Sequence, residues 1–152
     1  METWITYSYS DIDFVEKLKS LLQDSGLEFQ ETEHEILPGD NIVDTIYKSI
    51  TKAEIIFIVL SKDSVERKWF STELGIIISE IRNNPGKRIF PILIDKGVCI
   101  PPFIDHYQLL DLSDKKTYDL NIELLKKALK SPKEREFGLY LNSLWGFFQL
   151  FY

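Results

Sequence analysis

The sequence predicts an α/β protein with a flavodoxin-like, five-stranded parallel sheet in the order 2-1-3-4-5 and helices on both faces. Three observations lead to this fold class. Short apolar runs alternate along the chain with segments whose apolar residues recur at helical spacing. The run at residues 55–60, IIFIVL, has no polar residue, which is typical of a strand covered on both faces. The length of 152 residues suits one domain around one core.

The strands are expected where apolar or β-branched residues form short runs. These runs are residues 4–9, 27–30, 55–60, 89–94 and 108–112. Pro91 falls within the fourth run, which favours an edge or irregular position because proline cannot donate a hydrogen bond.

The helices are expected where apolar residues follow the helical period, at residues 14–22, 42–50, 70–81 and 120–129. Asp11 or Asp13 can cap the first helix, and Gly26 can end it. Asp40 is the expected cap of the second helix. Ligands of such sheets bind beyond the carboxyl ends of the strands, where the strand order reverses. For this order the loops concerned are residues 8–11 and 61–69.

Composition narrows the function classes. The formal net charge of -6 argues against nucleic acid as a partner. The single cysteine, Cys99, cannot form an internal disulfide, and His34 and His106 lack metal-ligand spacing, so no metal site is expected. No signal peptide is apparent at the start of the sequence, and we expect a cytoplasmic protein.

Several chemistries that flavodoxin-like folds carry lack their motif here. There is no glycine-rich dinucleotide or P-loop motif and no G-x-S-x-G elbow. The third strand ends at Ser61 rather than at the aspartate of a phosphoacceptor. What remains at the expected site is a carboxylate beside an aromatic residue.

That carboxylate is Glu73, which follows Trp69 by four residues at the start of the third predicted helix. At ~100° per residue, Glu73 lies roughly 80° from the centre of the apolar face, at the edge of the buried surface. Such a position suits a carboxylate in a cleft, although a first-turn glutamate is also favoured by the helix dipole alone. Arg67, with Lys62 and Lys68, is expected to be solvated surface charge, with a pyrophosphate contact as the alternative.

Three segments together resemble the TIR (Toll/interleukin receptor) domain. WITYSYSD at residues 4–11 is similar to the opening box, and LPGDNI at residues 37–42 is similar to the BB loop. IVLS at residues 58–61, followed by Trp69-x-x-x-Glu73, resembles the third box. The resemblance covers about residues 3–130 and looks closest to bacterial NAD-cleaving members. We therefore expect a TIR domain at residues 1–132 and an extension at residues 133–152.

The resemblance implies roles for individual residues. In enzymatic TIR domains the glutamate matching Glu73 is required for NAD+ cleavage, and the tryptophan matching Trp69 often stacks on the nicotinamide. The BB loop, here residues 33–41, covers the mouth of the pocket and often contacts a neighbouring molecule. Many relatives have histidine where this chain has Tyr9. The implied substrate-binding residues are Tyr7, Ser8, Tyr9, Leu37, Gly39, Asp40 and Trp69.

The implied function is an NAD+ glycohydrolase or cyclase of bacterial anti-phage defence. NAD+ is then the substrate, no cofactor is required, and the product is ADP-ribose, a cyclic isomer or a base-exchange conjugate. Self-association through the BB loop is expected. The alternative is a non-catalytic TIR scaffold that only binds other proteins.

The segment at residues 137–152 lies beyond the resemblance and carries seven aromatic residues in 16 positions. A bilayer-spanning helix needs about 20 apolar residues, so the segment is short for that role. We expect it to pack back on the domain. An oligomer contact is the first alternative, and a membrane-surface anchor is the least favoured.

Overall fold

The computed structural model describes residues 1–30, 35–67 and 70–130. The predicted extension at residues 133–152 and the predicted nicotinamide-stacking residue Trp69 both lie outside the described residues.

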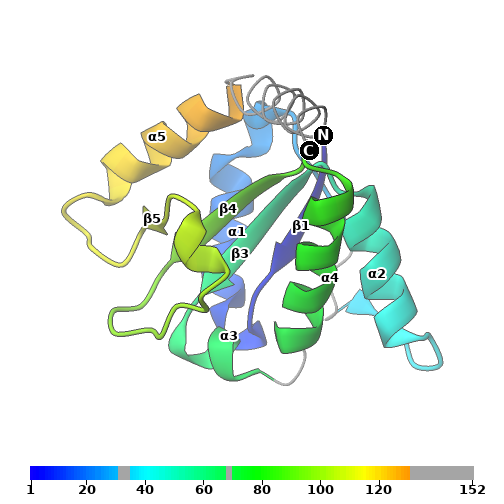
Figure 1. Ribbon diagram of the computed structural model, residues 1–152. Helices are drawn as coiled ribbons and strands as arrows, with labels where there is room; N and C mark the ends of the chain where they lie inside the picture. Colours follow the sequence, from blue (N-terminus) through cyan, green and yellow to red (C-terminus); the bar gives the residue numbers. More distant parts are fainter. Residues whose placement is uncertain (31–34, 68–69, 131–152) are drawn as a thin grey trace, which may run out of the picture.

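The sheet has the predicted order, β2-β1-β3-β4-β5, and every neighbouring pair is parallel. Figure 1 labels β1, β3, β4 and β5. β3 lies at its centre, and all of its residues are buried, as its apolar sequence predicts. The five strands are β1 (Glu2–Thr6), β2 (Glu28–Phe29), β3 (Ile55–Leu60), β4 (Arg88–Leu93) and β5 (Leu110–Asp111).

Helices cover both faces of the sheet, which confirms the predicted layers. The helices are α1 (Ile12–Leu21), α2 (Ile42–Lys52), α3 (Lys62–Glu66), α4 (Phe70–Asn83) and α5 (Tyr118–Lys130). α1 and α5 pack on one face, where Phe57 and Val59 of β3 join their core. α2 and α4 pack on the other face, where Ile56 and Ile58 of β3 lie. The alternation of side chains along β3 therefore gives the protein its two cores.

The end of β1 and the cap of α2 differ from the expectations. β1 ends at Thr6 rather than at Tyr9, because the chain turns into a short 3-10 helix at Tyr9–Asp11. α2 is capped by Asn41 and not by Asp40: the Asn41 side chain accepts a hydrogen bond from the Asp44 backbone at 3.0 Å. Asp40 instead accepts from the backbone N–H of Leu37, within the preceding turn.

Pro91 lies in β4, which has strands on both sides in the sheet order. β5 pairs only with Ile92 and Leu93, however, so Pro91 precedes the part of β4 that β5 reaches. Pro91 thus lies in the part of β4, Arg88 to Pro91, that has β3 as its only neighbouring strand, although β4 as a whole is not an edge strand. In the described part of the chain, no helix has the length and apolar character needed to cross a membrane.

Candidate functional site

The strand order reverses between β1 and β3, so their carboxyl ends form the switch point of the sheet. From β1 the chain runs into α1 on one face, and from β3 it runs through α3 into α4, which packs on the other. α3 and the start of α4 therefore lie beside the end of β1 (Figure 1).

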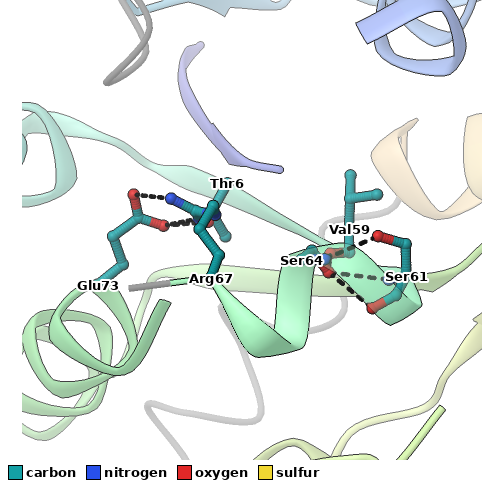
Figure 2. A network of polar contacts seen from close by, with 6 residues as sticks. All are labelled: Thr6, Val59, Ser61, Ser64, Arg67 and Glu73. Carbon is teal, nitrogen blue, oxygen red and sulfur yellow. Dashed lines mark hydrogen bonds and ion pairs between the residues drawn. The ribbon is translucent and has the colours of Figure 1, made fainter. Parts of the chain in front are cut away.

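Glu73 occupies this point as a buried carboxylate. The Thr6 hydroxyl, at the last residue of β1, donates a hydrogen bond to Glu73 Oε2. Arg67 Nη2 donates to the same oxygen at 2.9 Å and to Thr6 Oγ1 at 2.7 Å, and Arg67 Nη1 lies 3.5 Å from Glu73 Oε1. The three side chains form one closed network (Figure 2).

This burial corrects the expectation that Glu73 lies at the edge of the buried face. The helical period places Glu73 correctly relative to the apolar side chains of α4, but the end of β1 and the Arg67 side chain cover that edge. The expectation for Arg67 is corrected as well. Arg67 is not solvated surface charge, because its side chain is only 11% exposed and is ion-paired with Glu73.

The position of Arg67 follows from the serines that build α3. Ser61 caps α3 in a capping box with Ser64. The Ser64 hydroxyl is buried and donates to the carbonyl of Val59 in β3 at 2.7 Å. These bonds tie α3 to the end of β3 (Figure 2), so Arg67, the residue that ends α3, leaves at a fixed place beside β1.

The loop after β1 is held by acidic side chains. Ser61 Oγ donates to Asp11 Oδ2 at 2.5 Å, and Ser10 Oγ donates to Asp63 Oδ2 at 2.8 Å. Desolvation by burial raises the pKa of Asp11, the Ser61 hydrogen bond lowers it, and the nearby carboxylates of Asp95 and Asp63 raise it further. Asp11 stands at the start of α1, but its side chain makes no capping hydrogen bond there.

The predicted pocket residues of the first loop lie in different places. Tyr7 is buried in the core beneath α1 and α5, on the face of the sheet opposite to α4. Ser8 is partly buried and exchanges a hydrogen bond with Ser10 at 3.0 Å, and Tyr9 is 64% exposed. The structure thus places Thr6, and not Tyr7, beside Glu73.

The described part of the BB loop, residues 35–41, forms a tight turn at the end of the molecule where β1 and β3 finish (Figure 1). The Asp40 N–H donates to the Leu37 carbonyl at 3.1 Å, which closes a four-residue turn over Pro38 and Gly39. Gly39 has φ 97°, the positive value that a turn with glycine at its third position requires. Leu37 points into solvent, whereas Ile36 packs against the core beneath α2 and α4.

Sequence reasoning missed two residues of the network, Thr6 and the paired Arg67. For Thr6 a signal was available, because neighbouring residues of a strand point to opposite faces. With Tyr7 on the α1 side, Thr6 must face α4. For Arg67 the signal was hidden, because its six-residue separation from Glu73 spans the break between α3 and α4.

The network limits the chemistry of the site. Glu73 can accept hydrogen bonds from hydroxyl groups of a ligand and can stabilise nearby positive charge. Within the described residues no cluster of three or more histidine, cysteine or acidic side chains is arranged to hold a metal ion. Among the described residues, the network itself offers a carboxylate, a hydroxyl and a guanidinium.

Comparison with known proteins agrees with this architecture. Residues 4–126 match the family model described as TIR domain. No curated protein sequence matches the chain. Solved structures share the fold at low sequence identity, among them the following three.

The first is the TIR domain of the Toll-related receptor TRR-2 from Hydra magnipapillata, with TM-score 0.69, 21% identity and coverage of 86% of this chain and 98% of that one. The second is a metazoan TIR-STING receptor from C. gigas, with TM-score 0.63, 22% identity and coverage of 86% of this chain and 40% of that one. The third is the RPS4 and RRS1 TIR domain heterodimer, with TM-score 0.61, 15% identity and coverage of 84% of this chain and 94% of that one. The family match spans most of the chain, the sheet order is the predicted one, and the chain belongs to the TIR domain family.

Proposed function

We propose that this TIR domain cleaves the nicotinamide–ribose bond of NAD+, with Glu73 as the catalytic carboxylate. The observation that carries the proposal is the burial of a charged side chain at the switch point of the sheet. Removing a carboxylate from water is costly, and an apolar residue at this position of α4 would avoid that cost. A buried charge at a place where α/β sheets bind ligands is therefore a candidate functional group.

The chemistry needs few polar groups. Nicotinamide leaves NAD+ as a neutral molecule, so no acid has to protonate it. The ribose carbon develops positive charge as the bond breaks, as in glycoside hydrolysis. Glu73 would accept hydrogen bonds from the ribose hydroxyls and stabilise the developing cation. The acceptor that then attacks decides whether ADP-ribose, a cyclic isomer or an exchanged base is formed.

The remaining roles are proposals that follow the family resemblance. Trp69 would stack on the charged pyridinium ring, which cation–π attraction favours. Ser8 and Tyr9 would line the approach to Glu73, and the turn at Leu37, Gly39 and Asp40 would cover it. Because the Tyr7 side chain lies in the opposite core, its contribution would come through its backbone or through the packing of the loop. NAD+ is the substrate in this scheme, so no separate cofactor is needed.

A second candidate function is a non-catalytic scaffold that binds other TIR domains. It is favoured by exposed apolar side chains on the BB loop and the adjoining part of α2. These are Leu37, Ile42, Val43 and Tyr47, of which Leu37 is 70% exposed. Such side chains are typical of surfaces that contact other proteins. Self-association through this surface is compatible with either function, and a place in anti-phage defence belongs to the enzymatic proposal.

NAD+ consumption distinguishes the two functions. Purified protein would be incubated with NAD+ from nanomolar to high micromolar protein concentration, with and without a crowding agent. Nicotinamide and the ribosyl product would be separated by chromatography. The enzymatic proposal predicts stoichiometric release of nicotinamide with ADP-ribose, a cyclic isomer or a base-exchange conjugate. Intact NAD+ under every assembly condition would overturn it and favour the scaffold.

A further inference from the structure

The carboxylate proposed to act on NAD+ is already occupied in this structure. Glu73 Oε2 receives the Thr6 hydroxyl and Arg67 Nη2, and Arg67 Nη1 lies against Oε1. Arg67 also covers the carboxylate, because the side chain of Glu73 is 1% exposed and that of Arg67 is 11% exposed. Because so little of Glu73 is open to solvent, a ribose hydroxyl can reach the carboxylate only if a group packed over it moves.

Thr6 and Arg67 differ in how readily each can leave Glu73. Thr6 belongs to β1, which is paired with both β2 and β3, and its short side chain has one rotatable bond that directs the oxygen. Arg67 follows the last residue of the five-residue helix α3, and its long side chain is the more exposed member of the ion pair. Arginine can swing its guanidinium toward water while its aliphatic part stays packed. Arg67 is therefore the partner that can yield.

Because of the charges involved, Glu73 cannot hold Arg67 and bind the substrate productively at the same time. NAD+ presents a cationic pyridinium at the bond to be broken, and the ribose carbon becomes cationic as that bond breaks. A guanidinium bound to the same carboxylate would repel both positive charges and would reduce the stabilisation that Glu73 offers. The ion pair with Arg67 in the resting protein and the productive complex with NAD+ therefore compete for the side chain of Glu73.

Resting on the proposed function, we infer that Arg67 is an electrostatic latch on Glu73, opened when NAD+ binds, and that Thr6 keeps the released carboxylate in place. Arg67 is accordingly a positioning residue that acts through Glu73. Only the fraction of molecules with an open latch binds substrate productively, and the apparent affinity is the intrinsic affinity multiplied by that fraction. For a minor state populated at 10% or less, removing the latch raises kcat/KM about 10-fold or more.

The test compares two replacements of Arg67 in the full chain. Arg67→Gln removes the charge but keeps an amide that can donate a hydrogen bond. Arg67→Lys keeps the charge. Steady-state NAD+ cleavage would be measured at one fixed protein concentration, well below the melting temperature of every variant. Arg67→Gln is expected to raise kcat/KM about 10-fold or more, mainly through a lower KM with kcat within about twofold. Arg67→Lys is expected to stay within about threefold of wild type, because the lysine ammonium keeps a positive charge beside Glu73.

Lys87→Gln is the matched control, since Lys87 is a buried cation paired with Glu80 at the other end of α4. The inference is overturned by an Arg67→Gln variant no more active than wild type, by equal activation in Arg67→Lys, or by equal activation in Lys87→Gln, which would indicate general loosening. If Glu73→Gln abolishes cleavage while Arg67→Gln brings no gain, the latch alone fails. If wild type and every variant leave NAD+ intact, the proposed function fails and the latch fails with it.

Discussion

The Arg67–Glu73 ion pair should dominate the effect of either residue on stability, and a double-mutant cycle measures this directly. The nitrogen and oxygen of the pair lie 2.9 Å apart, with side chains 11% and 1% exposed. Removing one partner of a buried pair leaves an uncompensated charge, at a cost of about 3–5 kcal/mol. Arg67→Gln should lower the free energy of unfolding by about 3 kcal/mol, at the lower end of that range, because the shorter glutamine leaves part of Glu73 open to water.

Glu73→Gln should cost less, about 1–3 kcal/mol, because the partly exposed guanidinium can turn toward solvent. The double variant should be more stable than the sum of the single losses predicts, by about 1.5–3 kcal/mol. For a chain of this size a loss of about 3 kcal/mol lowers Tm by about 6–12 °C.

Urea titrations followed by far-ultraviolet circular dichroism of wild type, both single variants and the double variant give the four free energies. Additivity to within about 0.5 kcal/mol would refute the reasoning, because it would mean that the two side chains do not interact in the folded protein.

Three further predictions concern the loops and the assembly. Gly39→Val should lower NAD+ turnover while the domain stays folded, since a Cβ at Gly39 meets no atom within 4 Å and the strain comes from φ 97° alone; unchanged kinetics in a folded variant would exclude a gating role for the BB loop. Specific activity should rise with protein concentration, and deletion of residues 137–152 should weaken the rise if that segment contributes to self-association; a monomer by light scattering with constant specific activity would remove this idea. Burial raises the pKa of Asp11, so the folded state binds its proton more tightly than the unfolded chain, and ionisation of Asp11 reduces stability as pH rises from about 4 through the folded pKa. Asp11→Asn, which still offers an oxygen to Ser61, should therefore raise Tm at pH 7 but not at pH 3, and an equal shift at both pH values would contradict this assignment.

The fold could be predicted because local pattern and tertiary environment agree at its centre. The unbroken apolar run of β3 requires cover on both faces, and the spacing of apolar residues in α4 supplies part of that cover. The bounds of the two shortest strands were predicted less exactly, because their local sequence signals are weak. β2 and β5 have only two residues each, and the expected segments were longer because neighbouring apolar residues also fit the pattern.

The site was predicted in part. Glu73 was identified from its place in α4 and from the family pattern, but the depth of its burial was not. A helical period describes one helix, whereas burial also depends on what packs over that helix. Here Thr6 at the end of β1 and Arg67 at the end of α3 contact Glu73. The same limit explains why Asn41 rather than Asp40 caps α2: either residue can cap a helix, and the turn at Leu37 uses the Asp40 carboxylate.

The central claim is that the charge of Glu73 stabilises the transition state of NAD+ cleavage, and its most direct test is the rate of nicotinamide release by Glu73→Gln relative to wild type. Glutamine keeps the volume and hydrogen-bonding capacity but removes the charge. Glu80→Gln is the matched control, because Glu80 is also a buried, ion-paired carboxylate of α4, two turns further from the switch point. At equal folded fraction and equal protein concentration, Glu73→Gln should be slower by about 100-fold or more, as for other electrostatic catalytic groups. Glu80→Gln should stay within about threefold of wild type. Equal rates for wild type and Glu73→Gln would contradict the mechanism.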